Sequence, residues 1–117
     1  MAKLLMFNIR DQHKREEIQA LAFRLQARVI EVPPSRQGGT LRELLAGSTA
    51  IPPTTEPFTG EMLVMNGFER GDLDFFLNEL RRTGQTVALK AVVTETNQHW
   101  PAKLLYRELL AENRAMG

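Results

Sequence analysis

Cysteine is absent from this 117-residue chain, which also holds only two histidines, one tryptophan and one tyrosine. A chain without thiols forms no disulfide framework, no iron–sulfur cluster and no thiolate metal site, and it has no cysteine nucleophile. The spacing of His13 and His99 resembles no known pattern of metal ligands. We therefore expect neither a metal nor a cofactor, and a reducing cytoplasm is the expected location.

Neither sign of charge is in clear excess, because the chain has 15 Lys and Arg residues and 14 Asp and Glu residues, for a net charge of +1. This balance provides no broad field to gather nucleic acid or anionic lipid. The small basic cluster of Arg10 and residues 13–15 is offset by Glu16 and Glu17 and indicates a solvated helix start. We expect no nucleic-acid partner.

Long apolar runs are missing as well, since none approaches the roughly 20 residues that span a bilayer. A glycine-rich phosphate loop and the basic, aromatic strands of an RNA-binding sheet are also missing. We expect no membrane partner. What is present is an ordinary soluble composition, 43% hydrophobic and 25% charged, in a length that fits one domain.

Short apolar runs predict strands at residues 4–9, 29–32, 62–65 and 87–93. Helical spacing predicts a helix after the first strand, with an inner face at Ile18, Leu21, Ala22 and Leu25. Further helices are expected from a Thr40 cap to Gly47, from an Asp72 cap to Gly84, and from Pro101 onward. In the last helix we expect the inward residues to be Leu104, Leu105, Leu109 and Met116.

Residues 48–60 contain Pro52, Pro53 and Pro57 and little that could pack, so we expect a stiff connector that crosses the surface. The connector joins halves 1–47 and 61–117. Each half is too small to fold well alone, and residues 1–117 are therefore expected to form a single domain.

The two halves repeat the order strand, helix, strand, helix, and short stretches match in sequence. LLMFN at residues 4–8 resembles MLVMN at 62–66, and LRELLA at 41–46 resembles YRELLA at 106–111. These matches predict a duplicated βαβα unit with pseudo-two-fold symmetry. The first strands of the two halves are expected to be adjacent at the centre of a four-stranded sheet.

Two arrangements of this sheet fit the sequence. The first is an α/β fold with a parallel sheet in the order 2-1-3-4 and helices on both faces, which the alternating elements and the unbroken apolar strands favour. The alternative is a ferredoxin-like α+β sandwich with antiparallel central strands. In the parallel sheet Asn8 and Asn66 end side by side at the carboxyl edge, where open sheets bind ligands. In the antiparallel sheet they end at opposite edges.

Polar residues gather after the apolar strands, and such loops commonly carry binding groups on a rigid scaffold. The first hypothesis is therefore a small non-enzymatic module that binds a small polar ligand or a protein partner at the strand ends, with neutral hydrogen bonds and an apolar wall. The candidate residues are Asn8, Asn66, Gly67, Thr94, Thr96, Asn97 and Trp100. A structural interpretation competes, in which the asparagines form turns and the polar loop 94–99 caps the last helix.

Two alternative functions depend on other features. An enzyme would use Lys90, the only charge in its strand, as base or nucleophile with help from His99, and it would need that lysine buried beside a pocket. On an edge strand, Lys90 would instead keep its head in water and block edge-to-edge pairing. The other alternative is a homodimeric structural module that pairs through a sheet face or the last helix.

Residues 62–112 carry a more specific pattern. MLVMNGF at 62–68 is followed by LKAVVTETNQHW at 89–100 and then by a leucine- and glutamate-rich helix. This pattern resembles a bacterial and archaeal family of short proteins catalogued as a domain of unknown function, although relatives place a small hydroxyl residue where this chain has Pro101. The resemblance lends no activity and no catalytic residues. It singles out as positions of interest Lys90, Thr94, Thr96, Asn97 and Trp100.

Overall fold

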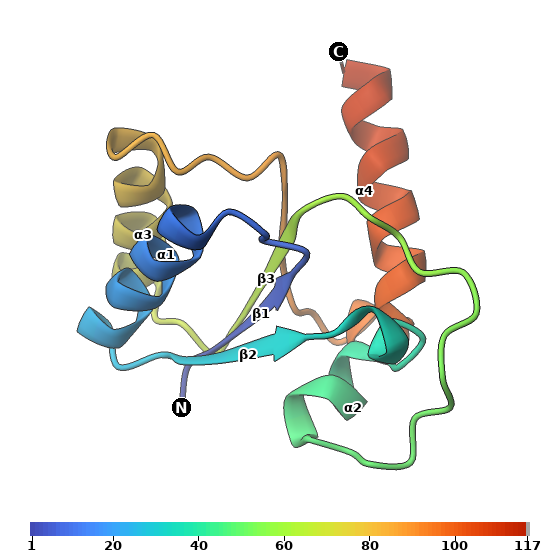
Figure 1. Ribbon diagram of the computed structural model, residues 1–117. Coiled ribbons are helices and arrows are strands. Elements are labelled where there is room, and N and C mark those ends of the chain that lie inside the picture. Colours follow the sequence, from blue (N-terminus) through green and yellow to red (C-terminus); the bar gives the residue numbers. More distant parts are fainter. Residues whose placement is uncertain (117) are drawn as a thin grey trace.

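The computed structural model describes the backbone of residues 1–116 and the side chains of residues 1–114. The predicted inward position of Met116 therefore lies outside the described side chains. The described residues form four strands and four helices, with two short 3-10 helices, η1 and η2. Figure 1 shows how these elements are arranged. In chain order the elements are β1 (Lys3–Phe7), α1 (Gln12–Arg24), β2 (Arg28–Val32), η1 (Pro34–Arg36), α2 (Leu41–Ala46), β3 (Met62–Asn66), α3 (Arg70–Arg82), β4 (Leu89–Val92), η2 (Asn97–His99) and α4 (Ala102–Met116).

The four strands form one mixed sheet in the predicted order, β2-β1-β3-β4. β1 is parallel to β2, and β3 is parallel to β4, but the central strands β1 and β3 are antiparallel. The prediction of a wholly parallel sheet is therefore wrong, and the alternative arrangement anticipated the antiparallel central pair. Apolar pattern could not decide between the two, because a strand buried on both faces reads as an unbroken apolar run in either direction.

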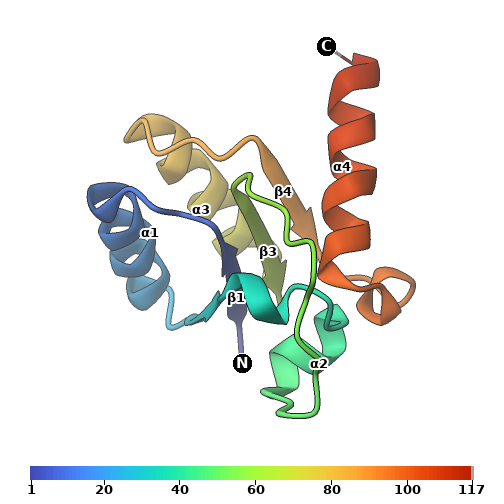
Figure 2. The same ribbon diagram turned by 45° about the vertical axis from the view of Figure 1, so that its right-hand side comes forward.

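Helices cover both faces of the sheet, as the first arrangement predicted (Figure 2). On one face α1 and α3 pack on alternate residues of the central strands, Leu4 and Met6 of β1 among them. On the other face α2 and α4 pack on the residues between, such as Leu5 and Phe7. Because both faces are buried, all of Leu4–Phe7 is inaccessible to solvent or nearly so. None of the helices among the described residues combines the length and apolar content that a bilayer crossing requires.

The proline-rich connector is more closely packed than its composition suggested. Phe58 is 9% exposed and belongs to the core between the sheet and the helices α2 and α4. Its ring stacks on Tyr106 at 4.1 Å between centroids and lies tilted against Phe7 at 5.7 Å. The expectation that residues 48–60 contain little that packs is therefore wrong at Phe58, an aromatic side chain whose burial contributes strongly to a core.

Several predicted helix ends are confirmed, and one is displaced. Thr40 and Glu43 form a reciprocal capping box at the start of α2, and Gly47 ends that helix at φ 70°. Gly84 follows α3 with φ 76°. Asp72, however, lies inside the first turn of α3, which begins at Arg70 with Glu69 as the flanking residue. A carboxylate in the first turn still interacts favourably with the helix dipole, so its position signals the same helix.

The halves are related by an approximate two-fold arrangement. Leu5 pairs with Val64 at the centre of the sheet, and Leu41 N donates to Trp100 O while Ala102 N donates to Gly39 O. The sequence matches do not follow this symmetry. LLMFN and MLVMN set Leu4 against Met62, and these two side chains belong to opposite faces. Internal duplication therefore remains a prediction, and the two sequence matches do not support it, because they do not align structurally equivalent residues.

Candidate functional site

The antiparallel central pair separates the two predicted asparagine tips. Lys3 pairs with Asn66, and Phe7 pairs with Met62. Asn8 follows Phe7, so it lies five residues along β1 from the position of Asn66, about 17 Å at the rise of an extended strand. The expectation that both tips meet at one edge is wrong, because it required parallel central strands.

Most of the other candidates lie together at the Asn66 end of the sheet. Val93 N donates to Met65 O at 3.0 Å, which brings the start of loop 94–99 beside the end of β3. Asn66 is half-buried there, while Thr96 is exposed. Their role in binding remains a prediction.

Asn97 and Thr94 build the loop itself. The Asn97 side chain is 9% exposed; its Oδ1 accepts from Thr94 N at 2.7 Å, and its Nδ2 donates to Val92 O at 3.1 Å. Thr94 Oγ1 accepts from Asn97 N at 3.0 Å. Since both polar ends of the Asn97 amide are already bonded within the loop, these contacts favour the structural interpretation for this pair.

Gly67 and Trp100 also make structural contacts. Gly67 has φ +75°, and a Cβ at this position would lie 2.9 Å from Met1 O, so the backbone approach requires glycine. Trp100 packs, half-buried, against the core on the α2 and α4 face, and its carbonyl accepts from Leu41 N at 3.0 Å. Neither contact tests ligand binding.

Asn8 lies at the other end of the sheet from Asn66, and its side chain holds the connector there. Its φ is +60°, and its Nδ2 donates to Phe58 O at 3.0 Å and to Gly60 O at 2.9 Å. The buried Gln37 completes this arrangement, because its Nε2 donates to Phe58 O at 3.2 Å and its Oε1 accepts from Phe58 N at 2.8 Å. These bonds hold residues 58–60 beside the end of β1, in keeping with the antiparallel register that pairs Phe7 with Met62.

Lys90 lies on β4, an edge strand, and its side chain is exposed. Its Nζ donates to Val87 O. Partial burial lowers the pKa of Lys90 below its ordinary value of 10.5, and the charge of Arg81 adds to this lowering. The enzyme alternative required Lys90 to be buried beside a pocket with help from His99. Both side chains are exposed, so that requirement is not met.

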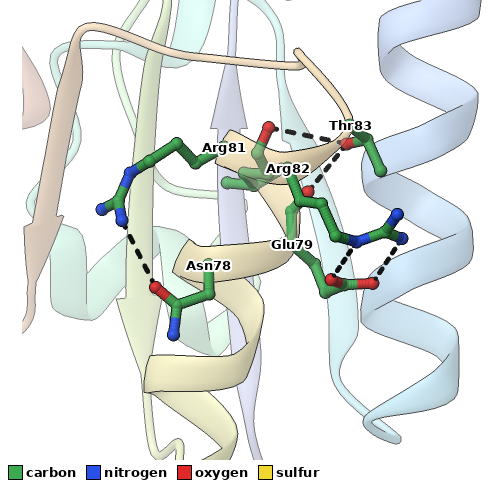
Figure 3. Close-up of polar contacts among 6 residues, drawn as sticks. Asn78, Glu79, Arg81, Arg82 and Thr83 are labelled. Atoms are coloured by element: carbon green, nitrogen blue, oxygen red, sulfur yellow. Dashed lines mark hydrogen bonds and ion pairs between the residues drawn. The ribbon is translucent and has the colours of Figure 1, made fainter.

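A polar cluster at the end of α3 is built from contacts within that helix (Figure 3). Arg82 donates two hydrogen bonds to the Glu79 carboxylate, at 2.6 and 2.9 Å, and Thr83 Oγ1 donates to Glu79 O at 2.8 Å. The hydrogen bond from Arg82 holds the pKa of Glu79 below its ordinary value of 4.5. The cluster closes the helix with a cation in its last turn, and Arg81 points away from it toward Asn78.

A pocket of about 350 Å³ opens where the parallel strands β1 and β2 end. Its apolar surface comes from the ends of these strands and from two consecutive prolines, while its polar surface comes from one amide, two guanidinium groups and one carboxylate. The lining residues are Met6, Asn8, Ile9, Arg10, Arg15, Glu31, Val32, Pro33 and Pro34. Carboxyl ends of parallel strands are the usual place for ligands in open α/β sheets.

The pocket carries an excess of positive charge. Arg10 Nη1 donates to Thr59 O at 2.9 Å, which holds its exposed side chain against the connector. Arg15 Nε lies 3.7 Å from Glu31 Oε1, and its Nη1 donates to Ile9 O at 3.5 Å. Two cations therefore face one carboxylate. Among the described side chains, no three His, Asp or Glu residues gather as a metal site.

Sequence reasoning missed these arginines as site residues and missed Gln37 and Phe58 as anchors. Arg10 and Arg15 were interpreted as part of a solvated helix start, because Glu16 and Glu17 follow them in sequence. In the structure Glu16 and Glu17 do not line the pocket. The usable signal was the position of Arg10 just after a buried strand, with Arg15 in the first turns of the helix that follows.

The comparisons with known proteins concern mainly the second half of the chain. Neither the curated proteins nor the solved structures include a significant match. A family model matches residues 61–116, from the start of β3 through α4, and it leaves the pocket at the ends of β1 and β2 outside the matched segment. The family model is described as Domain of unknown function (DUF3783), and its match to residues 61–116 confirms the resemblance noted in the sequence.

Proposed function

We propose that the protein is a small-molecule binding module, and that its ligand occupies the pocket at the carboxyl ends of β1 and β2. The ligand is a small molecule with an apolar body and one anionic oxygen group, a carboxylate or a phosphate. The observation that carries the proposal is the pairing of an apolar floor with two arginines in one opening. The proposal includes no catalytic step.

The geometry supports this class of ligand. Met6, Ile9 and Val32 offer apolar surface, and the prolines form a stiff wall because their rings restrict the backbone. Guanidinium groups bind carboxylates and phosphates through paired, charge-assisted hydrogen bonds. Arg15 is already held near Glu31, so an anionic ligand would share or replace that contact.

The test is an amide NMR titration with benzoate, and with neutral benzamide as the matched probe. We expect benzoate to shift the amide signals of residues 8–10 and 31–32, and benzamide to bind at least about tenfold more weakly, since it lacks the charge. Arg15→Gln should remove this preference. Arg42→Gln on the exposed side of α2 is the control and should keep it.

Equal binding of the two probes would contradict the anionic part of the proposal. Benzoate shifts confined to residues outside the pocket would contradict its location. Inorganic phosphate, titrated in the same way, separates the two ligand groups, because a phosphate site responds to it at lower concentration than to benzoate.

A further inference from the structure

A second opening lies between α4 and the connector, on the sheet face opposite α1 and α3. This groove has a volume of about 490 Å³. The groove is lined by apolar or aromatic side chains from Phe58, Leu104, Tyr106 and Leu110. It is also lined by two cations, Lys103 and Arg107. No residue of this groove lines the pocket at the ends of β1 and β2.

The aromatic part of the groove is preorganised by contacts within the protein. Phe58 is bonded through its backbone to Gln37, and its ring stacks on Tyr106 at 4.1 Å between centroids. Gly60 lets the tyrosine ring approach closely, because a Cβ there would lie 2.4 Å from the Tyr106 hydroxyl. A rigid aromatic platform loses little conformational entropy on binding, which favours its use as an anchor.

Among the described side chains, the cations beside this platform have no partner of opposite charge. Lys103 and Arg107 are spaced i, i+4, so their like charges are neighbours on the helix and mildly destabilise it. Neither forms an ion pair with any described residue. The nearest acids of α4, Glu108 and Glu112, do not stand three or four residues from either cation. Carboxylates from outside would relieve this repulsion.

The helix that carries the groove also extends well past the sheet. α4 has 15 residues, whereas its counterpart α2 has 6. Figures 1 and 2 both show the C-terminal part of α4 projecting beyond the rest of the molecule. Leu109 and Leu110 pack against the core but stay half-buried, so α4 keeps apolar surface that no other element covers fully.

We propose that this groove docks an acidic polypeptide segment of another protein. Apolar side chains of the segment pack on Leu104, Leu110 and Tyr106, and its Asp or Glu residues pair with Lys103 and Arg107. This docking is independent of the small-molecule pocket, and it assigns a role to α4 in the family-matched half of the chain.

The test selects binders from a random displayed library of peptides of about 15 residues, roughly four turns of helix. We expect the enriched peptides to combine apolar anchors with Asp or Glu. A synthetic peptide of enriched sequence should bind at least about tenfold more weakly to Lys103→Glu/Arg107→Glu, and binding should weaken as salt increases. Arg42→Glu and the pocket variant Arg15→Gln are controls that should bind as the unaltered protein does.

A charge-reversed peptide, with Lys in place of each acid, should prefer Lys103→Glu/Arg107→Glu over the unaltered protein. This swap separates a charge effect from simple unfolding of the variant. The proposal is overturned by the absence of enrichment, by enriched peptides without acids, or by equal binding to the double variant. It is also overturned if the same two substitutions abolish a dimer of the unaltered protein, since the occupant would then be a second copy.

Discussion

Asn8 and Gly67 occupy the left-handed region of backbone conformation, just after β1 and just after β3. In the approximate two-fold arrangement they are equivalent positions, because Leu5 and Val64 mark its centre. Asn8 tolerates the conformation through its side-chain bonds to the connector, and Gly67 tolerates it because it has no Cβ. Asparagine and glycine thus adopt the same left-handed conformation for different physical reasons.

Substituting alanine for Gly67, and for Gly71 as a control, tests whether the positive φ at Gly67 requires glycine. Gly67→Ala should lower the free energy of unfolding by about 1–2 kcal/mol, from its positive φ and the approach of Met1 O. Gly71→Ala is the matched change, since it lies in α3 with no atom near the added methyl, and it should stabilise the protein by about 0.5 kcal/mol. Urea denaturation measures both, and equal effects would contradict the account.

Gln37 is the buried polar side chain on which the connector depends. Gln37→Leu removes the partner of Phe58 N–H and should cost about 2–3 kcal/mol of unfolding free energy, because a buried donor is left unsatisfied. Gln12→Leu is the control, since the Gln12 amide bonds Glu16 on the surface, and its effect should stay within about 0.5 kcal/mol. A loss at Gln37 no larger than at Gln12 would show that this contact does not hold the connector.

Local signals predicted Thr40, Gly47 and Gly84, because caps and left-handed turns depend on residues close in sequence. Gln37 and Phe58 were missed, because their value arises from contacts 21 residues apart that no local pattern records.

At the scale of elements, the connector determines how the halves meet. It leaves α2, crosses the face that α4 also covers, and delivers the chain to the end of the sheet where β1 stops. Composition indicated a stiff, exposed segment. It could not show that one aromatic side chain near its end joins the core.

Phe58→Ala should therefore affect more than local packing. We expect a loss of about 3 kcal/mol in unfolding free energy and faster protease cleavage within residues 48–57, because the ring anchors the connector. Phe23→Ala is the matched control: Phe23 is 82% exposed, so its loss should change stability by less than about 0.5 kcal/mol. Unchanged cleavage in Phe58→Ala would contradict the anchoring role.

The edge strand β4 gives a prediction of a different kind. Lys90 is the only charged residue on that strand, and a lysine on an edge opposes pairing with a second sheet. Lys90→Val should keep the fold but promote association with increasing concentration, which light scattering detects. Lys90→Arg retains the charge and should stay at the original size. Association in both variants, or in neither, would rule out this role of the charge.

For the whole molecule, one feature of topology determines where function can lie. With the central strands antiparallel, the carboxyl ends of the two βαβ units face opposite ends of the sheet. The first unit has a pocket with two arginines at its end, whereas the polar loop of the second is bonded within itself at Asn97. Sequence predicted the strand order and both helix layers, but not the direction of the central strands, because both directions give the same apolar pattern.

Engineered disulfides test this direction most directly, because the chain has no cysteine of its own. Lys3 and Asn66 are direct partners, so their Cα atoms lie about 4.5–5.5 Å apart, within disulfide reach, whereas Asn8 and Asn66 are separated by about 17 Å. Under mild oxidation, Lys3→Cys/Asn66→Cys should form an intramolecular disulfide, and Asn8→Cys/Asn66→Cys should keep free thiols. A bond in the second variant and none in the first would contradict the antiparallel pair and the site assigned from it.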